Sequence, residues 1–188
     1  MKHKHLSELT LKEFDLYQEM LKEDTKDVYS ILKLFGYDID NLDIAELKVA
    51  ELEVSTMKLE DGKIKDIYII GDRRFKSNLD LKTLKASQFI DFESYISNFK
   101  LQEVLSVFLI PQKRNKFGKW ITPKYNDGYD IFDTQEYLYN NFPIGEANEL
   151  SAFFFSQSND LLTVMKGYLE KKEMKMKLKL QKIQLKIN

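Results

Sequence analysis

The side chains that could carry acid–base, metal or nucleophilic chemistry are few in kind. The 188-residue chain has no cysteine and only two histidines, His3 and His5, both close to the N-terminus. Without cysteine there is no thiolate nucleophile, no disulfide and no zinc–thiolate site. Because chain termini are poorly ordered unless the fold holds them, we interpret residues 1–9 as a flexible lead-in. A Ser-His-Asp site therefore has no credible base.

Carboxylates are plentiful, and the densest group near a glycine is Asp127, Asp130 and Asp133. A calcium-binding loop with Gly128 at its sixth position would have Pro123 as its first ligand and Thr134 in place of the bidentate glutamate, and neither residue fits. The chain also lacks the GxGxxG and GxxxxGKS/T loops that bind phosphate groups. We therefore predict no catalytic residue, no bound metal and no cofactor. An enzyme that uses carboxylates for acid–base or metal-dependent catalysis is kept as a further hypothesis.

One stretch combines cations with aromatic rings. Residues 112–128 read QKRNKFGKWITPKYNDG, a polar, basic loop with a small hairpin expected to turn at Phe117-Gly118. This composition suits single-stranded nucleic acid, through phosphate neutralisation and base stacking. It also suits a protein interface, where Trp, Tyr and Arg supply much of the binding energy. A third interpretation folds Trp120 back onto the core. The candidate partner-binding residues of this loop are Lys113, Arg114, Lys116, Phe117, Lys119, Trp120 and Tyr125.

A second group of cations lies at the C-terminus. The formal net charge of the chain is −1, but residues 170–188 hold seven lysines and two glutamates, so this tail carries +5 and the remainder −6. Apolar residues alternate with lysines from Met174 to Leu180, a pattern that fits either a strand or a frayed helix. Such a tail binds an acidic surface or nucleic acid, or stays solvated. Its candidate partner-binding residues are Lys171, Lys172, Lys175, Lys177 and Lys179.

The first third of the chain is expected to form three short helices that support these contact elements. Capping-box patterns at Thr10 and Asp43 open two of them, and Asp24 or Thr25 is expected to cap the helix between. Gly36 is expected to end that middle helix. Phe14, Tyr17 and Leu21 are expected on one face of the first helix, and the third helix is expected to carry Ile44, Leu47 and Leu52. In the middle helix the residues predicted to face inward are Val28, Ile31, Leu32 and Phe35.

The hydrophobic period changes after the third helix. Residues 54–78 contain a run of β-branched and aromatic residues followed by a Gly71-Asp72 turn, which predicts a two- or three-stranded antiparallel piece. A hairpin alone is marginal in water, so this piece is expected to lie against helices or another subunit.

The longest strongly periodic segment is residues 91–111. Its apolar residues follow helical spacing between a capping Asp91 and a terminating Pro111, which predicts a central helix at about 91–110. Further helices are expected to begin at Asp133 or Thr134, at Pro143 and at Asp160.

Three consecutive phenylalanines at 153–155 cannot all face one side of a helix, because successive residues are about 100° apart. We expect Phe155 to contact another element or another chain, and it is a further candidate partner-binding residue. Together these patterns predict a mainly α fold with a small antiparallel β-hairpin (α+β) at about 54–78. Residues 1–169 would form one compact helical domain around the central helix, followed by the basic tail.

The order of these features resembles that of a known family. The resemblance is carried, in chain order, by ILKLFGYDIDNLDIAELKVAEL, LKTLKASQFIDFESYI, LQEVLSVFLIP, a YD pair before a helix, and AFFFSQSNDLL. These segments resemble small tail-assembly-chaperone-like or virion-associated proteins of tailed bacteriophages, notably the crAss-like phages and their relatives, over about residues 11–169. The resemblance implies a non-enzymatic structural or assembly role and supplies no catalytic residues. The basic tail lies outside it, and the loop at 113–128 is longer than the pattern requires.

We therefore expect a phage structural or assembly protein, either a virion component of the portal or tail region or a tail assembly factor. Its expected partners are other phage structural proteins and a second copy of the chain, and DNA binding through the basic loop and tail is the alternative. No run approaches the roughly 18 apolar residues of a membrane span, and the N-terminus lacks the apolar core of a signal peptide. We expect the host cytoplasm as the site of action during assembly, with retention in the virion left open.

Overall fold

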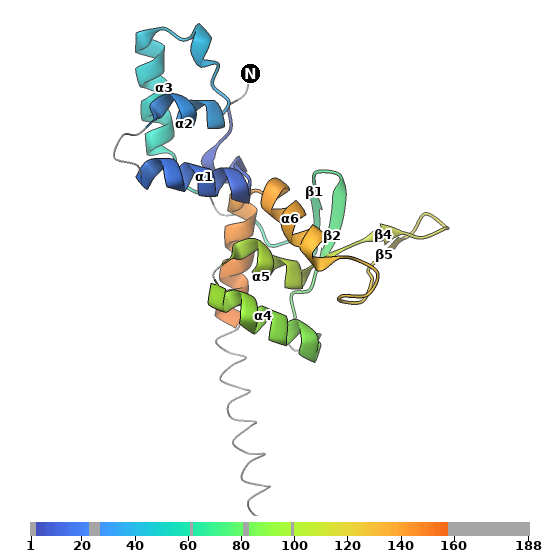
Figure 1. The fold of residues 1–188 in the computed structure, drawn as a ribbon. Coiled ribbons are helices and arrows are strands. Elements are labelled where there is room, and N and C mark those ends of the chain that lie inside the picture. The colour runs from blue at the N-terminus through green and yellow to red at the C-terminus, as the bar shows by residue number, and fades with distance from the viewer. Residues whose placement is uncertain (1–2, 23–26, 61, 81–82, 99, 158–188) are drawn as a thin grey trace, which may run out of the picture.

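The computed structural model describes residues 3–22, 27–60, 62–80, 83–98 and 100–157 (Figure 1). Within these residues the fold is mainly helical with a small antiparallel sheet, which confirms the predicted fold class. In chain order the elements are η1, a 3-10 helix (Leu6–Glu8), α1 (Leu11–Lys22), α2 (Val28–Leu34), a second 3-10 helix, η2 (Ile39–Asn41), α3 (Ile44–Thr56), β1 (Ile67–Ile70), β2 (Arg73–Ser77), α4 (Ala86–Asn98), α5 (Leu101–Phe108), β3 (Leu109–Pro111), β4 (Lys113–Arg114), β5 (Trp120–Ile121), α6 (Ile131–Asn141), and a C-terminal helix whose described part is 144–157.

The N-terminal lead-in is held by the rest of the fold, contrary to its predicted flexibility. The backbone amide of Lys4 donates to the carbonyl of Phe35 at 2.9 Å, and the ring of His3 stacks on Tyr37 with the ring centroids 3.8 Å apart. The side chain of His5 caps η1. The contacts of Lys4 with Phe35 and of His3 with Tyr37 join residues that are distant in sequence, so no local pattern could reveal them.

Both predicted capping boxes are present. The side chain of Thr10 accepts a hydrogen bond from the amide of Glu13 at 3.2 Å, and the Glu13 carboxylate accepts one from the amide of Thr10 at 3.0 Å. The reciprocal bonds between Asp43 and Glu46 measure 2.8 and 2.9 Å. The predicted starts of α1 and α3 are therefore confirmed.

Helix α2 begins later than predicted. Asp27 caps it, and its side chain accepts a hydrogen bond from the amide of Ser30 at 3.2 Å. The predicted caps Asp24 and Thr25 lie outside the described residues. Gly36 follows the end of the helix and adopts a left-handed φ of +86°. The prediction that Gly36 ends this helix is therefore confirmed.

Helix α3 continues to Thr56, so the predicted β piece does not begin at residue 54. Ala50 and Val54 of this helix are buried, whereas Ile44 and Leu52, two of the apolar residues expected on it, are exposed. Apolar residues occupy opposite sides of α3, so periodicity alone could not identify its buried side.

The sheet has the strand order β1-β2-β3 and is antiparallel throughout. The two-residue turn Gly71–Asp72 joins β1 to β2 as predicted. The third strand is β3, which comes from a distant part of the chain and pairs with β2 from Ser77 opposite Leu109 to Phe75 opposite Pro111. The prediction for 54–78 is thus confirmed for its hairpin and wrong for its first half.

The predicted central helix at about 91–110 is two helices and a strand. Lys100, between α4 and α5, has an extended backbone with φ −89° and ψ 105°. Helix α5 ends at Phe108 because the next three residues pair with β2. The sheet gives their backbone groups partners, and this long-range pairing outweighs the local helical period. The break allows α5 to pack against both α4 and α6.

The C-terminal helix closes the core through its aromatic triplet. Phe154 is buried and stacks on Phe108 with the ring centroids 3.6 Å apart, and Phe92 meets Phe108 edge-on at 5.2 Å. Phe153 packs against the same core, and Phe155 is half-buried.

The start of the chain is tied to the start of the C-terminal helix. The amide of Ile144 donates to the carbonyl of Leu9 at 2.7 Å, and the amide of Leu11 donates to the carbonyl of Phe142 at 3.0 Å. These two bonds fix the N-terminal helices to the half of the molecule that carries the sheet.

Candidate contact site on the β4–β5 hairpin

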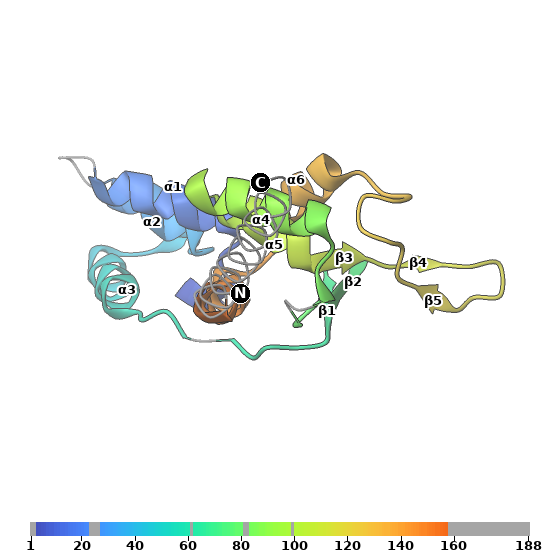
Figure 2. The ribbon, with the colours of Figure 1, turned by 90° about the horizontal axis from the view of Figure 1, so that it is seen from below.

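The basic loop forms the predicted small hairpin, and Figures 1 and 2 show this hairpin projecting from the body of the molecule. Gly118 takes a left-handed φ of +74° in its turn. The side-chain oxygen of Asn115 accepts hydrogen bonds from the amides of Phe117 and Lys119 at 2.9 and 3.0 Å. The turn is therefore braced by its own residues.

The hairpin exposes large apolar side chains. Phe117 is 75% exposed at the turn, and on β5 Trp120 is 41% exposed and Ile121 47%. Trp120 therefore does not fold back into the core. Exposed large apolar side chains on a projecting element are typical of a contact surface.

Two arginines flank Trp120. The guanidinium carbon of Arg114 lies 4.9 Å from the centroid of the indole ring, and that of Arg74, on β2, lies 5.3 Å away. The Nε of Arg74 donates to the side-chain oxygen of Gln112 at 2.7 Å, which fixes its direction. This cluster links the hairpin to the main sheet, with each cation–π contact contributing about 0.5–1 kcal/mol at an exposed site.

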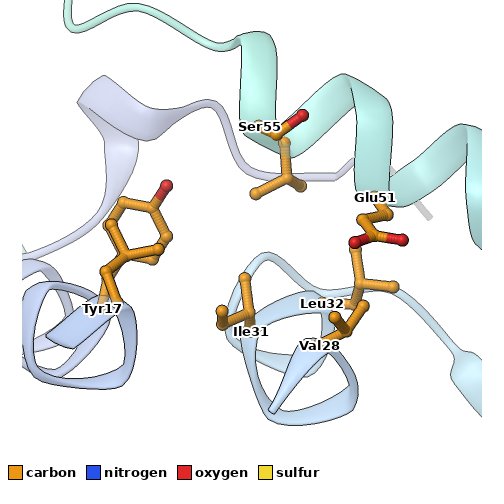
Figure 3. Close-up of a pocket in the computed structure, with 8 residues that line it drawn as sticks. Tyr17, Val28, Ile31, Leu32, Glu51 and Ser55 are labelled. Carbon is orange, nitrogen blue, oxygen red and sulfur yellow. The ribbon is translucent and has the colours of Figure 1, made fainter. Parts of the chain in front are cut away.

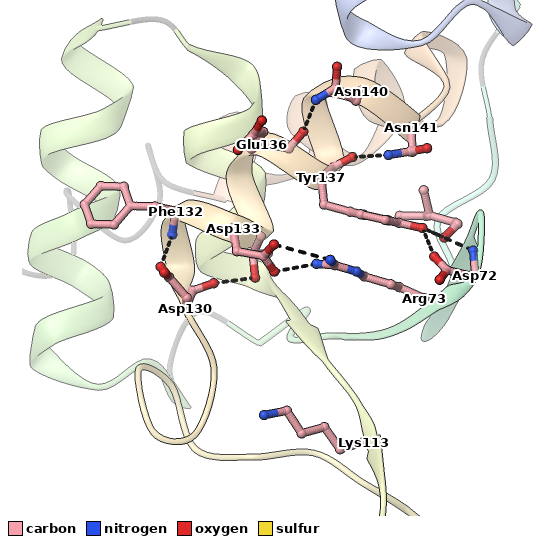
Figure 4. Close-up of polar contacts among 12 residues, drawn as sticks. Asp72, Arg73, Lys113, Asp130, Phe132, Asp133, Glu136, Tyr137, Asn140 and Asn141 are labelled. Carbon is pink, nitrogen blue, oxygen red and sulfur yellow. Dashed lines mark hydrogen bonds and ion pairs between the residues drawn. The ribbon is translucent and has the colours of Figure 1, made fainter.

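A groove of about 310 Å³ lies at the root of the hairpin. One wall is a polar network between the β1–β2 turn and α6 (Figure 4). Arg73 donates two bonds to the carboxylate of Asp133, at 2.5 and 3.3 Å. The hydroxyl of Tyr137 donates to the carboxylate of Asp72 at 2.6 Å and accepts from the amide of Asp72 at 3.1 Å.

The contacts in this network favour the charged forms of Arg73 and Asp72 and the neutral form of Tyr137. The hydrogen bond with Asp133 raises the pKa of Arg73, and the hydrogen bond from Tyr137 lowers the pKa of Asp72. Burial raises the pKa of the Tyr137 hydroxyl. At neutral pH each group therefore keeps the charge it has in water, so the network is suited to holding two elements together and not to proton transfer.

Tyr129 also lines the groove. Its hydroxyl oxygen is buried and has no hydrogen-bond partner of ordinary geometry among the described residues. Burial raises its pKa to about 12, although the backbone amide of Asn126 acts in the opposite direction. A buried hydroxyl without a partner costs roughly 1–3 kcal/mol, so a bound group that accepted a hydrogen bond from it would remove that cost.

The structure brings most of the predicted contact residues of the loop together and separates the others. Tyr125 is only 7% exposed and donates to the Asp91 carboxylate at 2.8 Å, so its inclusion in a contact surface is wrong. Phe155 belongs to the C-terminal helix, which lies apart from the hairpin in both views. The helix expected from Asp160 and the tail at 170–188 lie outside the described residues. The predicted contact residues that lie together on the hairpin are Lys113, Arg114, Lys116, Phe117, Lys119 and Trp120.

Sequence reasoning missed Arg73 and Arg74. Their position after the Gly71-Asp72 turn marks them as hairpin residues. Nothing in their spacing points to Asp133 or Trp120, because those contacts are made by strand pairing and helix packing between distant parts of the chain.

A second hollow, of about 240 Å³, lies between α1, α2 and α3 (Figure 3). Val28, Ile31 and Leu32 of α2 give it an apolar wall, and Glu51 and Ser55 of α3 lie across from them. Among the described residues that line it there is no histidine, lysine or cysteine to activate a nucleophile.

Among the described residues, no group of three or more His, Asp or Glu side chains is placed to hold a metal ion. Within that same part of the chain, no helix has the length and apolar character needed to cross a membrane. No protein-family model, curated protein or solved structure matches the chain. The projecting hairpin is therefore the feature from which a function can be inferred.

Proposed function

We propose that this protein is a non-enzymatic phage structural or assembly protein that contacts a partner protein through the β4–β5 hairpin. The observation that supports this proposal is that Phe117, Trp120 and Ile121 are all exposed on an element that projects from the body. Burial of their apolar surface by a partner would be favourable. The phage assignment follows from the sequence resemblance alone.

The arrangement around Trp120 favours protein over nucleic acid. Arg114 and Arg74 both lie within 5.3 Å of the ring centroid, so a base that stacked on this ring would compete with them. Side chains that are already ordered by such contacts lose less freedom on binding, which suits a preorganised protein interface.

The partner surface is expected to be acidic around an apolar centre. Residues 112–128 hold five cations and one carboxylate, a net charge of +4. Complementary charge would steer the encounter and set the orientation. An apolar pocket on the partner would receive Phe117, the most exposed of the three apolar side chains.

A photo-crosslinking amino acid at Phe117 tests this proposal in the full chain, expressed in the cells that make the protein. We expect crosslinks to one or a few proteins, identified by mass spectrometry, which weaken at least tenfold in the Arg114→Ala/Trp120→Ala background. The control places the same amino acid at Phe132, which is 71% exposed on α6. Equal crosslinking from both positions, or crosslinks to nucleic acid alone, would contradict the proposal.

The phage assignment has a separate test. Mass spectrometry of purified particles and of assembly intermediates should detect the chain in at least one of them. Presence in finished particles would identify a virion component, whereas presence only in intermediates would identify an assembly factor that acts in the host cytoplasm. Consistent absence from both would argue against a structural or assembly role.

Binding of single-stranded nucleic acid is the second candidate, because the same hairpin carries Lys116 and Lys119 beside its aromatic rings. Titration with single-stranded DNA across a range of salt concentrations measures this directly. Nucleic-acid binding predicts a falling affinity with a slope of roughly −0.7 per neutralised phosphate. A slope near zero, or unchanged affinity in the Lys116→Ala/Lys119→Ala/Trp120→Ala variant, would rule against it.

A further inference from the structure

Strand β1 forms an open edge of the main sheet. In the order β1-β2-β3 it pairs with β2 on one side only. The two-residue turn makes Ile70 and Arg73 a hydrogen-bonded pair, and such pairs alternate along an antiparallel ladder. In agreement, the amide of Ser77 donates to the carbonyl of Asp66 at 2.9 Å. The backbone groups of the intervening β1 residues therefore point away from β2.

The residues whose backbone points outward are Ile67 and Ile69. Neither their amides nor their carbonyls have a hydrogen-bond partner among the described residues. Unpaired groups on a sheet edge are a template for another strand. The side chain of Ile69 is 74% exposed, so an added strand would cover apolar surface as well as pair the backbone.

The two faces of β1 differ in chemistry. Tyr68 and Ile70 are buried on the core side. The carboxylates of Glu146 and Glu149 act electrostatically on the Tyr68 hydroxyl. Glu146 is paired with Lys65 at 2.7 Å, so Glu149 is the carboxylate that would attract a further cation to that side of the strand. Ile69 lies on the opposite face. A strand that added here would suit apolar side chains on its outer face and cations on its inner face.

The segment 174–180 of the same chain has this two-sided pattern. Apolar residues alternate with lysines at a period of two, which in a strand places them on opposite faces. The apolar face would cover Ile69, and the lysine face would approach Glu149, which has no ion-pair partner among the described residues. The alternating residues are Met174, Lys175, Met176, Lys177, Leu178, Lys179 and Leu180.

We propose that residues 174–180 pair with the open edge of β1 as a fourth strand of the main sheet. The 16 residues between Gln157 and this segment can span roughly 50 Å when extended. A globular domain of this size is about 40 Å across. The segment can therefore reach β1 from the end of the described C-terminal helix without help from a second copy.

Amide hydrogen exchange of the full-length protein, resolved by NMR, tests the pairing. We expect the amides of Ile67 and Ile69 to exchange at least about tenfold more slowly than in the full-length Lys177→Pro/Leu178→Pro variant, because proline removes ladder donors. The alternate amides of β1, which pair with β2, are internal controls and should not change. Rapid exchange at both isoleucines, or protection that survives the prolines, would overturn the proposal.

Engineered disulfides test which face and which chain are involved, in a protein with no cysteine of its own. Ile69→Cys is combined in turn with Met176→Cys, Leu178→Cys and Leu180→Cys, and at least one pair should form a disulfide within a single chain under mild oxidation. The matched Ile69→Cys/Lys177→Cys pair should not. A disulfide that joins two chains, or one formed only by the lysine position, would overturn the proposed strand.

Discussion

The guanidinium carbon of Arg73 lies 4.0 Å from the centroid of the Tyr137 ring, and the hydroxyl of that ring bonds to the neighbouring Asp72. Asp72 and Tyr137 are 65 residues apart in the chain. An ion pair with Asp133 completes the connection. Helix α6 and the β1–β2 turn are thus held together at the root of the projecting hairpin.

Replacing Tyr137 with phenylalanine should lower the free energy of unfolding by about 1–2 kcal/mol, because the hydroxyl bonds to Asp72 are lost while the ring against Arg73 is kept. Urea unfolding of the full chain at pH 7 measures this. The control is Tyr29→Phe at an exposed position, which should change stability by less than about 0.5 kcal/mol. An equal loss of stability in the two variants would mean that the Tyr137 hydroxyl does not help to hold α6 to the β1–β2 turn.

Gly71→Ala should destabilise the fold by roughly 2–4 kcal/mol, since the new Cβ would lie 2.5 Å from the Tyr137 hydroxyl at a residue with φ +55°. Gly128→Ala is the matched control. Its φ is +79°, but no heavy atom lies within 4 Å of the new Cβ, so it reports backbone strain alone. Thermal unfolding of both variants separates the two effects. If they lose the same stability, the clash with Tyr137 has no cost.

Tyr129→Phe should reveal a pH dependence with a definite sign. The tyrosine ionises near pKa 10 when unfolded but near 12 when folded, so the folded state loses stability relative to the unfolded state as the pH rises from 10 toward 12. The variant lacks this loss, and by pH 11 its stability relative to the native protein should improve by on the order of 1 kcal/mol. Urea unfolding at pH 7, 9 and 11 checks this. Parallel pH profiles of the two proteins would contradict the assignment.

Replacement of phenylalanine by alanine should affect the free energy of unfolding strongly at Phe154 and very little at Phe117. Phe154→Ala should cost about 3–5 kcal/mol because it empties a buried site stacked on Phe108. Phe117→Ala should change the free energy of unfolding by less than about 0.5 kcal/mol because this ring is 75% exposed. Chemical denaturation of both variants provides the comparison. A large loss at Phe117 would mean that the hairpin turn is part of the core.

Local signals in the sequence predicted local structure correctly. The capping boxes at Thr10 and Asp43 and the turn at Gly71-Asp72 depend on residues within a few positions of one another, and all three are present. The hairpin in the basic loop was also predictable, because Gly118 permits the left-handed turn that its strands require.

The errors arose where distant segments compete with local preference. The apolar period that suggested a helix through residue 110 gave way to strand pairing with β2, and the N-terminal lead-in is ordered by Phe35 and Tyr37. The contact site was predicted in part for the same reason. Its hairpin is local, but the contribution of Arg74 depends on a strand that lies far earlier in the chain.

The bonds that join Leu9 and Leu11 to Ile144 and Phe142 have a consequence for synthesis of the protein. Residues near the N-terminus leave the ribosome long before their partners exist, since at 5–20 residues per second the first 144 residues take roughly 7–30 s to make. During that interval the N-terminal helices lack Phe142 and Ile144, the residues whose backbone groups bond to Leu11 and Leu9. The final arrangement therefore waits until the helix that begins at residue 144 has emerged, and a nascent chain arrested before that point would keep apolar faces of α1 available to chaperones.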